Sequence, residues 1–151
     1  CVWFKAPKSP MAQKLIVLDG EHSGPALNVA VMSNISPEYV PSNAPHGTAL
    51  IAAACPGIDV NVDPAQLESD VRAQLGSWWG PQVAAWSVLA TQRIAHGQPS
   101  SNPPFSARRR QHLGEGVWVC GDHRDTPSIQ GALFSGRRCA EEVLSAARLS
   151  A

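Results

Sequence analysis

The stretch 117–147 constrains this chain most, because its pattern predicts a strand, a tight turn and a helix in direct succession. Residues 117–120 form a short run of strand-favouring side chains. Gly121 and Asp122 then end the run with a residue that permits tight backbone geometry and with a carboxylate. This succession brings a strand end and a helix N-terminus together.

The helix is predicted to begin after residues 125–128, where Asp125, Thr126 and Ser128 are typical caps and Pro127 suits a first turn. From Ile129 on, apolar and small residues recur at three- and four-residue spacings. They are Ala132, Leu133, Gly136, Ala140, Val143, Leu144 and Ala147. The other face is charged, with Arg137, Arg138, Glu141, Glu142 and Arg148. We expect an amphipathic helix packed on a sheet.

The start of this helix is suited to binding negative charge. Its first backbone amides have no partner within the helix, and the helix dipole is positive there. Gly131 and Gly136 keep this end thin, so a flat ligand can approach the backbone. Asp122 can accept hydrogen bonds from ligand hydroxyls. The pattern favours a polyhydroxylated or anionic ligand, and the alternative is an ordinary strand and helix whose glycines only permit close packing.

This stretch resembles the C-terminal flavin motif of the amine oxidase and phytoene desaturase superfamily, whose members are FAD-dependent oxidoreductases. The matching residues are Gly121-Asp122, Ser128-Ile129, Gly131-Ala132, Ser135-Gly136 and Ala140. The resemblance implies that Asp122 binds near the ribityl and pyrophosphate part of FAD, and that the helix start lies by the pyrimidine edge of the flavin ring. The implied cofactor-binding residues are Gly121, Asp122, Ser128, Ile129, Gln130, Gly131 and Ala132.

The likeness extends loosely over the whole chain and is closest to the phytoene-desaturase-like group. Residues 92–99 align with a strand that descends toward the flavin, and His96 stands where relatives often have an aromatic residue. A histidine there is a candidate for moving a proton or orienting a substrate. The alternative is a histidine hydrogen-bonded at a strand end.

Composition restricts the other function classes. The 151 residues are 44% hydrophobic and 16% charged with a formal net charge of zero, which suits a globular domain and argues against binding nucleic acid or anionic membranes. We expect the only basic run, 108–110, to be a solvated loop. No apolar run approaches the roughly 20 residues needed to cross a bilayer, so no integral membrane segment is expected.

The four cysteines lack metal-site spacing, and the C-x-x-H formed by Cys120 and His123 lacks two further ligands. We expect no metal site. We also expect free, buried thiols in a reducing intracellular compartment, cytoplasm or plastid. The chain opens at Cys1 inside a strand-like run without an initiating methionine, so we expect a fragment or a processed piece.

The rest of the chain predicts an antiparallel sheet and one further helix. Pro64 after the candidate cap Asp63 begins a helix over 64–79, and the proline-containing segment 33–47 is predicted to be a loop. Strands are predicted at 2–6, 15–18, 26–32, 48–55 and 85–94, the fourth as a buried strand with a nearly unbroken apolar run.

The predicted fold class is therefore α+β or α/β. It combines part of an antiparallel substrate-domain sheet with the closing strand and helix of an FAD-binding, Rossmann-like domain. The expected domains are a substrate-domain part at 1–98, a loop at 99–116, and the C-terminal FAD-binding strand, turn and helix at 117–151.

The expected function is that of the C-terminal part of an FAD-dependent oxidoreductase, which transfers hydride from a C–H or C–N bond of a small or lipophilic substrate to flavin. No G-x-G-x-x-G dinucleotide motif occurs in the sequence. We therefore expect an upstream FAD-binding part of the same protein as partner, and no activity from the isolated chain. A dehydrogenase that uses only a nicotinamide is disfavoured by the same missing motif.

The alternative is a flavin-free interaction or structural domain that docks onto a partner chain. We expect six large aromatic residues to find cover only with difficulty in so small a unit, which would make the isolated chain self-associate. They are Trp3, Phe4, Trp78, Trp79, Trp86 and Trp118.

Overall fold

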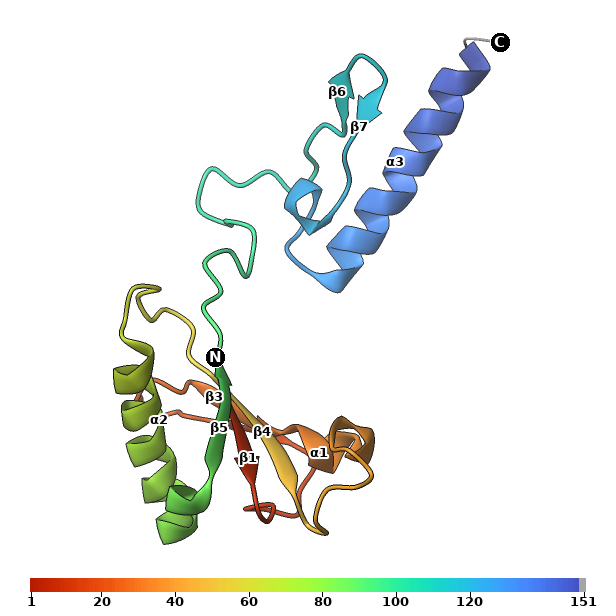
Figure 1. Ribbon diagram of the computed structural model, residues 1–151. Coiled ribbons are helices and arrows are strands. Elements are labelled where there is room, and N and C mark those ends of the chain that lie inside the picture. Colours follow the sequence, from red (N-terminus) through yellow and green to blue (C-terminus); the bar gives the residue numbers. More distant parts are fainter. Residues whose placement is uncertain (150–151) are drawn as a thin grey trace. The chain divides into compact units, whose positions relative to one another are not determined.

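The computed structural model describes residues 1–149 and divides the chain into two compact units, Cys1–Ala95 and His96–Ala151 (Figure 1). The first unit contains a five-stranded antiparallel sheet in the order β2-β3-β4-β1-β5. Its strands are β1 (Val2–Ala6), β2 (Ile16–Leu18), β3 (Asn28–Val31), β4 (Ala49–Ala54) and β5 (Ser87–Thr91). The predicted antiparallel sheet is confirmed; β1 has the expected bounds, and the other four strands are shorter than expected.

The predicted helix is present as α2 (Pro64–Trp79). The Asp63 carboxylate accepts hydrogen bonds from the amides of Ala65 and Gln66 at 3.4 and 3.3 Å, which satisfies two of the free N–H groups at the helix start. Gly80 ends the helix with a positive φ of 74°, a conformation that glycine adopts without strain.

The core of the first unit lies between one face of the sheet and α2. Alternate strand residues such as Phe4, Val29 and Ile51 are fully buried and belong to one cluster with the α2 residues Val71 and Leu75. The expectation of a buried strand at 48–55 is wrong for half of its side chains. Strand β4 alternates buried and half-buried positions, because helix α2 packs on only one face of the sheet.

The large aromatic residues are better covered than expected. Phe4 and Trp86 are buried and meet edge to face at 5.8 Å, and the other four are half-buried. The Arg72 guanidinium lies 5.2 Å from the Phe4 ring centre and donates to the carbonyls of Val83 and Trp86. The exposed apolar surface is contributed instead by other, mostly aliphatic, side chains.

Three short helices of the first unit were not predicted. They are α1 (Met32–Ile35), η1 (Pro37–Tyr39) and η2 (Gly80–Ala85). The first is a single turn closed by the bond from the Ser36 amide to the Met32 carbonyl. It ends the expected strand 26–32 one residue early and occupies the start of the expected loop 33–47.

The second unit begins with a hairpin of β6 (His112–Gly114) and β7 (Val117–Trp118). Strand β6 falls within the segment 99–116 that was expected to be a loop. The turn that joins the strands has positive φ at Gly114, Glu115 and Gly116, so the Gly-x-Gly sequence was the missed signal. The unit continues with η3 (Asp122–Arg124) and ends in α3 (Ile129–Leu149).

Helix α3 is amphipathic as predicted, but the expected packing face is wrong. Gly131, Ser135 and Cys139 are the buried positions of α3, whereas Leu133 and Leu144 of the expected core face are 69% and 58% exposed. The small residues on the other side of the helix let the chain segment 119–128 approach closely, and the two-stranded hairpin is too small to cover the apolar face as well. Within the described residues, this apolar stripe is uncovered.

The four cysteines form no disulfide, and only Cys139 is buried. The expectation of buried thiols is wrong for Cys120, which is exposed, and for the half-buried Cys1 and Cys55. Burial and the neighbouring Cys120 raise the pKa of the Cys139 thiol. Among residues 1–149 there is no group of three potential metal ligands, and no helix is long and apolar enough to cross a membrane.

The side-chain amide of Gln74 joins α2 to the turn between β2 and β3 through three hydrogen bonds. Its amide nitrogen donates to Asp19 and to the Ala26 carbonyl at 2.8 and 2.9 Å, and its oxygen accepts from the Ala26 amide at 2.8 Å. Asp19 and Gln74 are both buried. Loss of this side chain leaves buried polar groups unpaired.

We expect Gln74→Ala to lower the free energy of unfolding of the first unit by about 2–3 kcal/mol, because buried partners lose their bonds. Urea unfolding followed by tryptophan fluorescence measures this, since four of the five tryptophans lie in this unit. Gln66→Ala is the matched control on the exposed side of α2 and should change stability by less than about 0.5 kcal/mol. Equal losses in the two variants would contradict the role of Gln74.

Candidate functional site

The segment from Gly121 to Ala132 forms the turn that the sequence singled out, between β7 and α3. Gly121 has a φ of 144°, and a Cβ atom at this position would lie 2.7 Å from Nδ1 of His123. Only glycine combines this backbone conformation with so close a neighbour. Gly121 thus allows the chain to turn sharply into η3.

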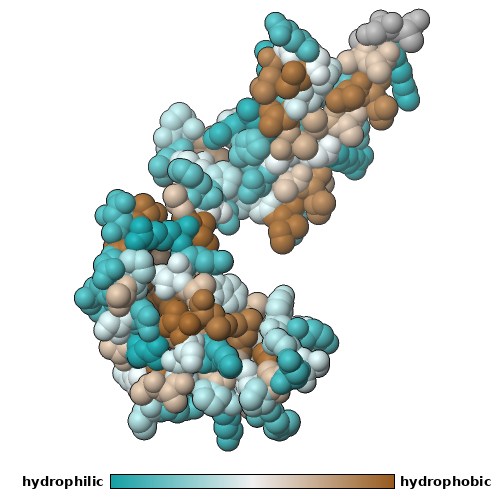
Figure 2. Space-filling model, viewed as in Figure 1, coloured by the Kyte–Doolittle hydropathy of each residue, from teal (hydrophilic) through white to brown (hydrophobic). Residues whose placement is uncertain are grey.

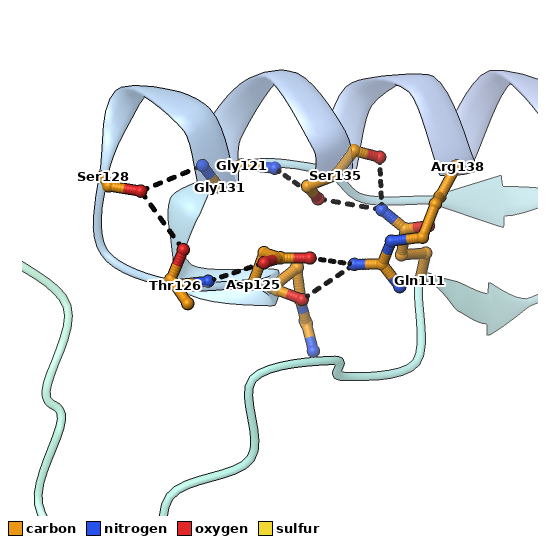
Figure 3. A network of polar contacts seen from close by, with 9 residues as sticks. Gln111, Gly121, Asp125, Thr126, Ser128, Gly131, Ser135 and Arg138 are labelled. Carbon is orange, nitrogen blue, oxygen red and sulfur yellow. Dashed lines mark hydrogen bonds and ion pairs between the residues drawn. The ribbon is translucent and has the colours of Figure 1, made fainter.

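Ser128 is the N-cap of α3. Its hydroxyl accepts a hydrogen bond from the Gly131 amide at 3.0 Å, and its carbonyl accepts from the Ala132 amide at 3.0 Å. The Thr126 hydroxyl lies 3.1 Å from the Ser128 hydroxyl and extends the cap (Figure 3). The predicted capping by Ser128 is confirmed, and it fixes where the helix begins.

The first two amides of α3 remain available. Ile129 and Gln130 are exposed, and their backbone N–H groups donate to no other group among residues 1–149. The helix behind them runs for 21 residues, so its dipole favours a negative or electron-rich group at this end.

Asp122 supplies an acceptor in the same segment. Its side chain is 38% exposed, and the ring nitrogen Nδ1 of His123 lies 4.0 Å from the carboxylate. No hydrogen bond to this carboxylate is made by the described residues. A ligand hydroxyl can therefore be accepted without breaking an internal bond.

The turn is tied to α3 by Ser135 and Gln111, both fully buried (Figure 3). The Ser135 hydroxyl accepts from the Gly121 amide at 3.1 Å and from the Gln111 side chain at 2.8 Å. The Gln111 nitrogen also donates to the Ser135 carbonyl, and its oxygen has no partner. Arg138 holds the other side of the turn, donating to Asp125 at 2.8 Å and to the Arg124 carbonyl at 3.2 Å.

Gln111 and Arg138 were missed as site-forming residues. Gln111 lay in a segment expected to be a loop, and Arg138 was assigned to the charged outer face of the helix. Arg138 had no local signal, because its partners are 13 and 14 residues away.

Gly131 has a neighbour from the chain itself. A Cβ atom here would lie 1.9 Å from the Thr126 carbonyl oxygen and 2.7 Å from its hydroxyl. The absence of a side chain at Gly131 therefore lets the turn pack closely against α3. The role of Gly131 toward FAD stays a prediction.

His96 is not at a strand end. Strand β5 ends at Thr91, and His96 lies in an exposed turn five residues further on. No hydrogen bond or ion pair of the described residues involves it. Its assignment as a catalytic residue gains no support from this position and stays a prediction.

A family model for flavin-containing amine oxidoreductases matches residues 1–144. The chain belongs to this family. Searches among curated proteins and among solved structures found no match. The family contains flavin, so FAD is the cofactor that membership supports. The residues present fit such a group, because within the described structure the Asp122 carboxylate accepts no hydrogen bond and two amides at the start of α3 donate none.

Alanine substitution of two glycines on α3 tests how closely the turn packs against the helix. Gly131→Ala should destabilise the second unit by about 1–3 kcal/mol, because the new methyl group displaces Thr126. Gly136→Ala is the matched control, since nothing lies within 4 Å of its Cβ position, and it should stabilise the helix by up to about 1 kcal/mol. Hydrogen exchange of the α3 amides measures both, and equal protection in the two variants would contradict the close contact.

Proposed function

We propose that the chain is the C-terminal part of an FAD-dependent oxidoreductase that takes hydride from a C–H or C–N bond of a small or lipophilic substrate. The observation that carries the proposal is the combination of the family match with the Gly121–Ala132 turn, which holds the Asp122 carboxylate, free of hydrogen bonds within the described residues, and the open start of α3. The phytoene-desaturase-like pattern of this turn supports that branch of the family. FAD supplies the redox chemistry when bound.

The residues of the chain bind and orient the cofactor. Asp122 accepts hydrogen bonds from the hydroxyl-bearing part of FAD, and the amides of Ile129 and Gln130 donate to the pyrimidine edge of the ring. The α3 dipole stabilises negative charge at that edge. Ser128 and Ser135 hold the turn in place for these contacts. We interpret β7 and α3 as the closing strand and helix of a Rossmann-like FAD domain.

The face of the five-stranded sheet that lies opposite α2 supports a lipophilic substrate. One row of directly paired residues crosses all five strands on this face, and none of its members is buried. The row consists of Ile16, Ala30, Ala52, Trp3 and Ala90. Figure 2 shows apolar, brown surface over the strands of this unit. The three alanines of this row leave room for an apolar molecule against the backbone.

The exposed stripe of α3 supports a partner. Ile129 and Leu133 are 79% and 69% exposed, and Leu144 and Val143 continue the stripe toward the C-terminus. Brown surface marks the N-terminal end of this helix in Figure 2. We assign the stripe to contact with an upstream FAD-binding part of the same protein, which would supply the missing G-x-G-x-x-G motif. On this basis the isolated chain has no oxidoreductase activity.

The second candidate function is a flavin-free interaction domain, and the same stripe favours it, because an apolar helix face of this kind suits any protein partner. A visible absorption spectrum and an FAD titration distinguish the two functions. Retention of flavin by the chain mixed with the upstream part supports the oxidoreductase. Absence of flavin from a folded mixture that still associates supports the interaction domain.

We expect Asp122→Ala to weaken FAD binding by the assembled protein about tenfold, because a carboxylate that accepts ligand hydroxyl bonds contributes about 1.5 kcal/mol or more. Fluorescence titration of FAD measures the change. Glu142→Ala is the matched control, since it removes an exposed carboxylate more than three turns along α3 and should leave the affinity unchanged. Unchanged affinity in Asp122→Ala would defeat the assignment of Asp122.

We expect Leu133→Asp to abolish association with the upstream part, because a charge within the apolar stripe must be desolvated on contact. Its exposure means that the fold of the second unit is retained. Ser145→Asp adds the same charge to another exposed position of α3 and should associate normally. Sedimentation of the mixtures measures this, and normal association of Leu133→Asp would remove the stripe from the interface.

A further inference from the structure

The first unit contains a pocket that the flavin assignment does not use. It has a volume of about 440 Å³ and lies where β1, β4 and β5 meet the segment 39–48. Leu50 and Leu89 line it from the strands, and Val40, Pro41 and Pro45 line it from the segment. This size is within the range of pockets that bind small organic molecules.

One positively charged side chain, that of Lys5, lines this pocket. Lys5 is on strand β1, where it is directly paired with Leu50 of β4 on one side and with Ser87 of β5 on the other, and it points away from the α2 core. No hydrogen bond or ion pair joins its ammonium group to another residue among 1–149. None of the residues that line the pocket is acidic. The positive charge of Lys5 is therefore not neutralised within the pocket.

The wall opposite the strands is preorganised. The Thr48 hydroxyl and amide both donate to the Pro45 carbonyl at 2.7 and 3.1 Å, and the Ala44 amide donates to the Pro41 carbonyl at 2.9 Å. Two prolines further restrict the backbone. Since these donors are already used, the lysine ammonium and the side chains of Tyr39 and Asn43 remain as donors toward a ligand.

We propose that this pocket binds a small organic monoanion with an apolar body, of the aryl or alkyl carboxylate class. The carboxylate pairs with the Lys5 ammonium, and the apolar body lies between Leu50, Leu89 and the proline-containing wall. The single Lys5 ammonium group matches one negative charge on the ligand. The same positive charge repels ammonium compounds. The apolar lining gives a body of carbon and hydrogen a favourable contact. The proposal does not depend on the flavin site.

The test is isothermal titration of 4-phenylbutyrate into the full chain, with far-UV circular dichroism to show that each variant is folded. Lys5→Gln should weaken binding about fivefold, because the charge-assisted hydrogen bond of the exposed Lys5 ammonium group is lost. Lys8→Gln is the matched control, since Lys8 is exposed and does not line the pocket, and it should bind like the unmodified chain. The neutral analogue 4-phenylbutan-1-ol should bind the unmodified chain about tenfold more weakly than the acid.

A second variant tests the pocket without touching the charge. Ala44→Trp places a large side chain in the half-buried wall and should prevent binding of 4-phenylbutyrate while the sheet remains folded. The proposal is overturned if the folded chain does not bind the acid, if Lys5→Gln binds it as tightly as Lys8→Gln does, or if the alcohol binds as tightly as the acid. Full binding by Ala44→Trp would place the ligand elsewhere.

Discussion

The Ser135 hydroxyl is the contact on which the second unit depends. It accepts from the Gly121 amide and from Gln111, so one buried oxygen joins the turn, the hairpin and α3. A larger side chain at this position would separate α3 from the turn. An apolar one would remove the acceptor of the Gly121 amide and leave Gln111 only its bond to the Ser135 carbonyl. The position of the open helix start relative to Asp122 follows from this one bond network.

Sequence patterns predicted the regular elements of the first unit well because local signals and tertiary packing agree there. Asp63 and Pro64 start α2, and alternating strand residues face its apolar stripe. The single-turn α1 and the hairpin strand β6 escaped prediction, since their hydrogen bonds close over few residues and leave little periodicity. For the site, the turn and the Ser128 cap were predictable. Gln111 and Arg138 were not, because they act through partners distant in sequence.

The helix face of α3 shows what periodicity alone does not reveal. Apolar spacing located the aliphatic stripe of α3 correctly, but it did not reveal that this stripe is exposed in the described structure. Inside the second unit the helix packs through Gly131, Ser135 and Cys139, because small residues permit the closest approach of the backbone. An α-helix can thus present two packing faces, one of small residues used within its own unit and one of aliphatic residues suited to another body.

The edges of the five-stranded sheet limit how another chain can attach. Strand β2 offers an outer edge of only three residues, and the register of β5 against β1 shifts between Trp3 and Phe4. Short edges and irregular pairing both disfavour the addition of a further strand. Association through this unit would therefore use side-chain faces rather than backbone hydrogen bonds. A single polar substitution on such a face would weaken the association. A proline placed beyond the strand ends would not affect it.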